Sequence, residues 1–142
     1  MQHFYIDFSA ITPKKINDLA KENARLIVKE DRVKTHQIRN IFSYIERMRI
    51  EFKQLIRLEE KDDDFQKLKN SLTMRLLLLK PKIAYAAGRS KGFRNRFFPL
   101  VEAAIEGVEM VSVEEKIEAY QKFFALMESI VAYHKFFDSE PK

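Results

Sequence analysis

THQIRNIFSYIERMRIEFKQLI, residues 35–56, is the stretch of this sequence that decides the fold. Its apolar side chains recur at alternating spacings of three and four residues, which places them along one face of an α-helix. Thr35 is a favourable first residue because its hydroxyl can accept a bond from a free backbone N–H. The stretch therefore predicts a helix of about 24 residues, which is long for a small domain. The apolar positions are Ile38, Ile41, Ile45, Met48, Phe52 and Leu55, with Phe42 and Ile56 widening the stripe.

Helical patterns also lie on both sides of this stretch. Because several helices are available to cover the long stripe, we interpret it as the seam of a bundle within one domain. The alternative is a dedicated coiled-coil dimer. The other segments are expected to run from Thr12 and Pro13 to an exit at residues 30–32, from Phe65 towards Lys80, over about residues 95–106 before Gly107, and from a capping box of Ser112 and Glu115 to Phe137.

The end of the third segment carries two expectations. Met74, Leu77 and Leu78 make its last turns apolar almost all round, so this end should be the most buried part of the bundle. Pro81 cannot donate a backbone hydrogen bond, so a kink or break is expected there, followed by a short helical piece. That piece should end at Gly88, and residues 88–92 should form a mobile, electropositive loop.

The composition fits a helical protein. The 142 residues suit one domain, 1–142, with an N-terminal extension over 1–11 and a charged tail over 138–142. Apolar residues make up 46% of the chain, enough for a core, and only three glycines and four prolines interrupt it. We therefore predict an all-α, single-domain bundle of about five helices, with a long second helix and a proline kink near residue 81.

Several classes of protein are excluded or disfavoured by the sequence. The chain has no cysteine, which removes disulfides, thiolate chemistry and zinc–sulfur sites. The N-terminus lacks the pattern of a secretory signal, and the longest apolar runs, such as Leu76–Leu79, are too short to span a bilayer. We expect a soluble, cytoplasmic protein with no membrane contact.

Catalytic motifs are scarce. The three histidines, His3, His36 and His134, are far apart in the sequence, and His134 is expected to be a hydrogen-bonded core or interface residue. No phosphate-binding glycine-rich loop or nucleophile elbow is present. The acidic run at residues 59–64 is interpreted as a solvated connection, with a Mg²⁺ site at Asp62–Asp64 as the alternative. We predict no enzymatic activity, no metal and no cofactor.

The charge of the chain is unevenly distributed. Nine basic residues and no acidic residue lie between Phe65 and Leu100, in a chain whose net charge is +5. Such a band predicts a polyanionic partner, most commonly phosphate. Within it, residues 80–96 carry six cations, and Tyr85 and Phe93 are candidates either for stacking on bases or for the core. A second row of cations, Arg49, Lys53 and Arg57, follows the long helix at spacings of four residues, and solvation explains it as well as a partner does.

Three stretches together resemble a known family. They are VKTHQIR at residues 33–39, LKPKIAYAAGR at 79–89 and MESIVAYHKF at 127–136. In this order they resemble the small subunit of type III-A CRISPR effector (Csm) complexes, and the resemblance covers about residues 33–137. The LKPKIAYAAGR stretch and the IVAYHKF ending are its most specific parts.

The resemblance implies a helical, non-catalytic subunit that binds the backbone of crRNA and target RNA without sequence specificity. Several copies would pack along the effector filament beside the other Csm-complex subunits. The positions that match the family's motifs and are expected to contact RNA are Arg39, Lys80, Lys82 and Arg89. Charge alone adds Lys53, Arg57, Lys91 and Arg94 to this set.

Two further hypotheses concern association. The alternative function is a helical oligomerisation or adaptor protein whose long helix pairs with another chain and that binds no nucleic acid. For either function, a long helix joined to its neighbour by the polar connection at residues 59–64 can exchange helices between two copies. We therefore expect a homodimer in isolation, and helix exchange is one way in which it can form.

Overall fold

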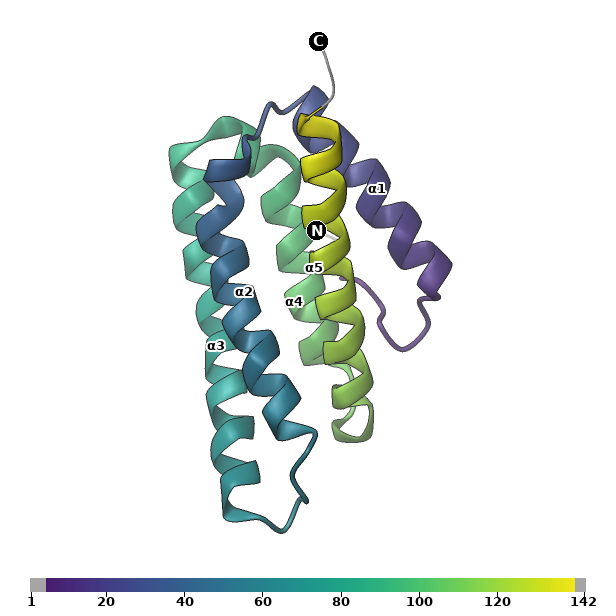
Figure 1. Cartoon of the computed structure of the whole chain (residues 1–142), viewed down its shortest axis with the longest axis vertical. Coiled ribbons are helices and arrows are strands. Elements are labelled where there is room, and N and C mark those ends of the chain that lie inside the picture. Colours follow the sequence, from purple (N-terminus) through teal and green to yellow (C-terminus); the bar gives the residue numbers. More distant parts are fainter. Residues whose placement is uncertain (1–4, 140–142) are drawn as a thin grey trace.

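The computed structural model describes residues 5–139, and within this range it contains helices and no strand (Figure 1). The long helices α2 and α3 lie side by side and antiparallel, and α5 packs against both α1 and α2. A π-helical turn, η1, leads into α4, and a 3₁₀ turn, η2, leads into α5. The prediction of an all-α bundle is confirmed. The elements are α1 (Pro13–Lys29), α2 (Thr35–Leu55), α3 (Asp63–Arg89), η1 (Phe93–Phe97), α4 (Phe98–Met110), η2 (Val113–Glu115) and α5 (Lys116–Asp138).

The predicted stripe of α2 forms the seam of the bundle. All six of its heptad positions, from Ile38 to Leu55, are buried. The ring of Phe52 lies 5.5 Å from that of Phe124 and 5.6 Å from that of Tyr120, both on α5. Each large side chain buried in this way contributes about 1.5–3 kcal/mol, so the seam is a principal source of the free energy of folding.

The starts of the helices follow local rules, with small shifts. The Thr12 hydroxyl accepts a bond from the Lys15 N–H at 3.2 Å, as expected for the N-cap of α1. Helix α2 begins one residue earlier than a Thr35 cap implies, because Lys34 occupies the N-cap position and its N–H donates to the Gln37 side chain at 2.7 Å. Asp62 caps α3 by accepting a bond from the Asp64 N–H at 3.0 Å.

Of the kink or break expected at Pro81, the break is wrong, and the kink stays a prediction. Helix α3 is 27 residues long and runs without interruption from Asp63 through Pro81 to Arg89. Proline removes one N–H from the helical ladder, but Pro81 and Leu77 are exposed, so water can reach the carbonyl that loses its partner. The mobile loop is also wrong, since Gly88 lies within α3 and helical structure resumes at Lys91, leaving Ser90 alone between the two.

The burial expected at the end of the third segment is wrong as well. Met74, Leu77 and Leu78 are exposed by 43–56%, and the buried face of α3 consists of its other apolar positions. The apolar residues surround the helix, whereas neighbouring helices cover only part of its circumference. This leaves an apolar surface on α3 that faces solvent.

Two expectations for the later helices also need correction. Gly107 does not end the fourth helix, because α4 continues to Met110 and Gly107 is buried in it. A Cβ at Gly107 would overlap the carbonyl oxygen of Ile6, so the extension at residues 5–11 packs closely here. The capping box is absent, since Ser112 bonds the Glu115 side chain at 3.5 Å and makes no side-chain bond to a backbone N–H. Residues 1–4 and 140–142, which include His3 and most of the predicted tail, lie outside the described residues.

Two buried polar groups fix the connection between α1 and α2. The side chain of Asp31 is only 2% exposed and accepts bonds from Arg96 and Asn95, both at 2.7 Å. His134 of α5 is fully buried and donates its Nε2–H to the Val33 carbonyl at 2.7 Å. The prediction that His134 is a hydrogen-bonded core residue is therefore confirmed.

We predict opposite effects for two glycine substitutions. A Cβ at Gly92 would overlap the carbonyl oxygen of Asp31, so Gly92→Ala should lower the free energy of unfolding by about 1–3 kcal/mol. Gly88 lies in a helix with no atom within 4 Å of an added Cβ, so Gly88→Ala should raise it by about 0.5–1 kcal/mol. Urea unfolding followed by circular dichroism measures both, and shifts of the same sign would contradict the packing described.

We also predict a specific loss of stability at alkaline pH. Burial raises the pKa of Tyr120 to about 12, above its ordinary value of 10.0. The contribution of the protonated phenol is therefore complete below pH 10 and is lost as the pH approaches 12, a change of about 2–3 kcal/mol. Tyr120→Phe does not titrate, so the stability difference between the wild-type chain and this variant should fall by that amount over this range. Urea unfolding at a series of pH values tests this, and a constant difference would refute it.

Candidate nucleic-acid interface

The exposed face of α3 carries two basic side chains and a tyrosine near its C-terminal end. Lys82, Tyr85 and Arg89 are spaced by three and four residues, so they lie on one side of the helix. All three are exposed, and Tyr85 is 68% exposed, the second-highest value among the large apolar side chains of the described residues. By contrast Phe93, the other aromatic candidate, is 1% exposed and belongs to the core.

These side chains line a groove between the start of α2 and the end of α3, with a volume of about 850 Å³. Its walls contain two lysine or arginine side chains, Lys82 and Arg89, and no carboxylate. A cation in such a groove has no anionic neighbour within the lining, so the groove favours an anionic ligand. The remaining lining residues are His36, Gln37, Asn40 and Ile41 from α2, Leu78, Pro81, Tyr85 and Ala86 from α3, and Ser90 and Phe93.

Both cations are held over aromatic rings. The Lys82 ammonium lies 5.0 Å from the centre of the Tyr44 ring, and the Arg89 guanidinium lies 5.6 Å from that of Tyr85. Tyr44 is itself fixed, because its hydroxyl donates to the Arg75 carbonyl at 2.8 Å, and burial raises its pKa. Arg89 also donates to the Tyr85 hydroxyl at 3.2 Å. These contacts restrict both cations without neutralising them.

Lys91 and Arg94 lie beyond the end of α3, beside a second hollow of about 530 Å³. Both are exposed, and Arg94 donates its Nε–H to the Ala87 carbonyl at 3.3 Å. Glu30 and Asp31 line the same hollow. The cations here therefore have acidic neighbours, unlike those of the groove.

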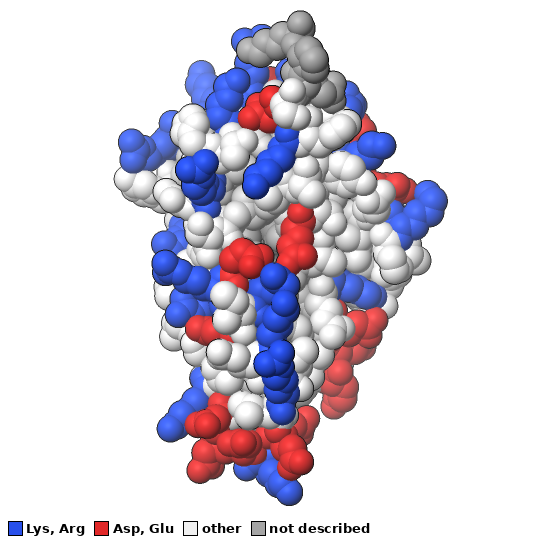
Figure 2. All heavy atoms as spheres, in the orientation of Figure 1, with Lys and Arg blue, Asp and Glu red and all other residues white. Residues whose placement is uncertain are grey.

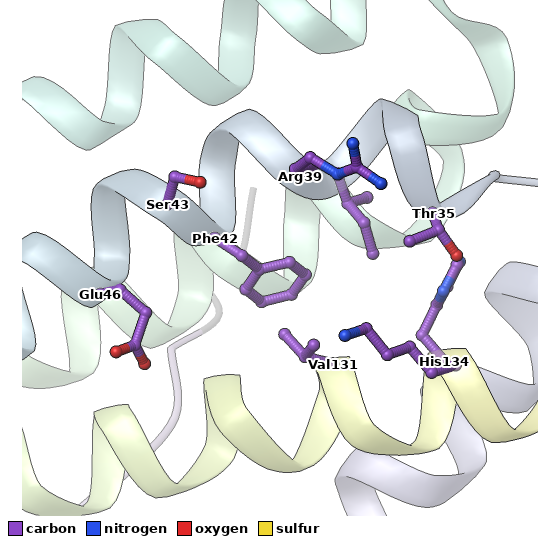
Figure 3. Close-up of a pocket in the computed structure, with 9 residues that line it drawn as sticks. Thr35, Arg39, Phe42, Ser43, Glu46, Val131 and His134 are labelled. Atoms are coloured by element: carbon purple, nitrogen blue, oxygen red, sulfur yellow. The ribbon is translucent and has the colours of Figure 1, made fainter.

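Arg39 lies on another side of α2, at a pocket of about 360 Å³ between α2 and α5 (Figure 3). In this view Phe42 and Val131 face each other across the pocket, while Glu46 lies farther along α2. Lys135 contributes a second cation. The pocket is thus separate from the groove, although both use the first turns of α2.

The remaining predicted contacts lie away from the groove. Lys80 forms an ion pair with Glu109 of α4 at 2.8 Å, so its charge is already balanced. Lys53 and Arg57 are exposed near the end of α2, about 20 Å along the helix from Asn40. Figure 2 shows acidic side chains gathered at the end of the molecule that holds the α2–α3 connection. The eight predicted residues therefore do not form one patch.

Sequence reasoning missed the contribution of α2 to the groove. His36, Gln37 and Asn40 are distant in sequence from the basic band, and only the pairing of α2 with α3 brings them beside Lys82 and Arg89. One feature of the sequence marks positions 36 and 40. They are four residues apart and lie outside the apolar stripe, so they share a face of the helix that is not buried by it. The acidic run has a structural role in capping α3, and residues 5–139 contain no group of three metal-ligating side chains close enough to hold an ion.

An all-α bundle with a carboxylate-free cationic groove and an exposed apolar helix face is the kind of molecule that binds polyanions or partner subunits. A comparison with family models gives the class a name, since residues 10–140 match the model described as Csm2 Type III-A. The chain belongs to this family and is a small subunit of type III-A CRISPR (Csm) complexes, which confirms the resemblance. Membership implies association with the other subunits of the complex.

No curated protein and no solved structure matches the chain. Among the described residues, no helix is sufficiently long and apolar to cross a membrane.

Proposed function

We propose that this subunit binds the backbone of crRNA and target RNA without sequence specificity, performs no catalysis, and packs along the effector filament in the cytoplasm. The observation that carries the proposal is the carboxylate-free groove, in which Lys82 and Arg89 have no acidic partner. When a cation without an acidic partner contacts an RNA phosphate, it releases a counterion that was bound to the RNA. This release drives non-specific binding.

The proposed surface extends from the groove to the nearby exposed cations Lys91 and Arg94. Arg39 is a further proposed contact, on the α5 side of α2. We leave out Lys80, because an RNA phosphate would have to replace Glu109, which already pairs with it. Lys53 and Arg57 are also left out, since acidic residues surround the end of α2 on which they lie. The carboxylates there would repel a phosphate chain.

Salt dependence tests the proposal. For single-stranded RNA each phosphate contact contributes about −0.7 to the slope of log affinity against log salt, so the five proposed contacts predict a slope of about −3.5. The double substitution Lys82→Ala and Arg89→Ala should reduce the slope to about −2.1, because two of the five contacts are lost. Fluorescence anisotropy with the full chain and a labelled single-stranded RNA, at several salt concentrations, measures both slopes.

The matched control is the double substitution Lys53→Ala and Arg57→Ala, which removes the same net charge from the same molecule. It should leave the slope close to that of the wild-type chain. Affinity that ignores salt, or equal losses in the two double variants, would contradict the proposed surface.

A second proposal concerns self-association, favoured by the exposed apolar side chains of α3. We propose that the isolated protein forms a homodimer by helix exchange about the connection between α2 and α3. Straightening this connection would let α3 of one copy remake its contacts on α2 of the other, including the ion pair of Arg75 with Glu51 at 2.6 Å. Exchange conserves these contacts, so its cost is small.

Cross-linking tests this proposal, because the chain has no native cysteine. The side chains of Glu51 and Ser71 are in contact, with 3.0 Å between their oxygens. A chain with Glu51→Cys and Ser71→Cys should give a covalent dimer with a short bismaleimide if helices are exchanged. Cross-links confined to one chain, or a monomeric mass by sedimentation equilibrium across a wide concentration range, would refute the exchange.

A further inference from the structure

Tyr85 is an exposed aromatic side chain within the cationic groove. In the described residues its ring has no aromatic neighbour, and Arg89, one turn along α3, contacts both its ring and its hydroxyl. Leu78 and Pro81 continue the apolar surface on the same wall of the groove. A contiguous apolar surface that a folded protein leaves uncovered beside a cavity marks a candidate binding site.

We propose that the groove binds one unpaired RNA base, stacked on the ring of Tyr85. This inference rests on the proposed RNA-binding function and adds a ligand chemistry that backbone contact does not supply. The guanidinium of Arg89 lies over the ring, so the opposite face is left for a second planar group. Every nucleobase has such a face, and stacking on an aromatic side chain tolerates any base.

The positions of the charges fit a single nucleotide. Lys82 precedes Tyr85 by three residues and Arg89 follows it by four, so the backbone positions of the two cations lie on either side of Tyr85, about 10 Å apart along the helix. A base on Tyr85 would therefore have its two flanking phosphates directed towards opposite cations. The groove volume of about 850 Å³ is within the range of sites that accept small molecules of this size.

The opposite wall supplies hydrogen-bonding groups. His36 and Asn40 of α2 line the groove, and neither side chain forms a hydrogen bond to another group within residues 5–139. Gln37 is less available, because its side-chain oxygen already accepts the Lys34 N–H. An amide and an imidazole can bond the edge of a base or the 2′-hydroxyl of its ribose. A paired base inside a duplex has both faces covered by stacking and its Watson–Crick edge used in pairing, so the site selects unpaired RNA.

The test uses the full chain and a single-stranded RNA that carries 2-aminopurine at one internal position, whose emission is quenched on stacking. Wild-type protein should quench the emission and bind this RNA more tightly than the same sequence in a duplex. Tyr85→Leu keeps an apolar side chain without an aromatic face, and it should remove the quenching and weaken binding about 10-fold. Its salt slope should be unchanged, because no phosphate contact is lost.

Tyr85→Phe is the matched control, since it retains the face of the ring and should keep both the quenching and the affinity. Because Tyr85 is exposed, the variants should unfold at the same urea concentration as the wild-type chain.

The outcomes separate the base site from the function on which it rests. If Tyr85→Leu binds RNA like the wild-type chain, the base site is wrong while backbone binding stands. If the wild-type chain binds no RNA, both proposals fail. If Tyr85→Leu instead abolishes assembly with the other Csm subunits and leaves RNA affinity intact, the groove is a protein-docking surface, and the base site is again overturned.

Discussion

The packing of α2 against α3 and α5 is the constraint on which the rest of the structure depends. The six heptad positions of its apolar stripe, from Ile38 to Leu55, are all buried, which fixes the rotation of α2 about its own axis. Once that rotation is fixed, positions 36 and 40 must lie at the edge next to α3, whereas Arg39 lies at the edge next to α5. The groove is therefore a consequence of the core, because the core determines which polar side chains meet beside Lys82 and Arg89.

The sequence predicted correctly the features that depend on local periodicity. It failed for features that are determined by tertiary contacts between helices. The stripe of α2 and the cap at Thr12 were predicted correctly, since each follows from the spacing or chemistry of neighbouring residues. The burial of Met74 and Leu78 was not, because an all-round apolar helix does not reveal which faces its neighbours will cover. The absent break at Pro81 belongs with these failures, since the packing of α3 on both sides of Pro81 keeps the helix continuous.

The charge pattern shows the same limit in another form. Residues 65–100 contain no acid, yet the fold pairs Lys80 with Glu109 and Arg96 with Asp31. Burial of Asp31 makes its bond to Arg96 structural, and that bond is the main reason why the pKa of Arg96 is raised. A cationic band in a sequence therefore overstates the charge available to a ligand. The cations that matter are those that the fold leaves without acids.

This distinction divides the outer surface of α3 into two parts with different chemistry. Near Met74 and Leu77 the surface is apolar, which suits contact with protein, while from Lys82 to Arg89 it combines cations with an aromatic ring. The proposed function requires the subunit to contact partner subunits and RNA at the same time. Because the two parts follow one another along a single rigid helix, a protein contact on the first need not cover the second. The continuity of α3 through Pro81 then has a physical consequence, since a break there would have uncoupled the two surfaces.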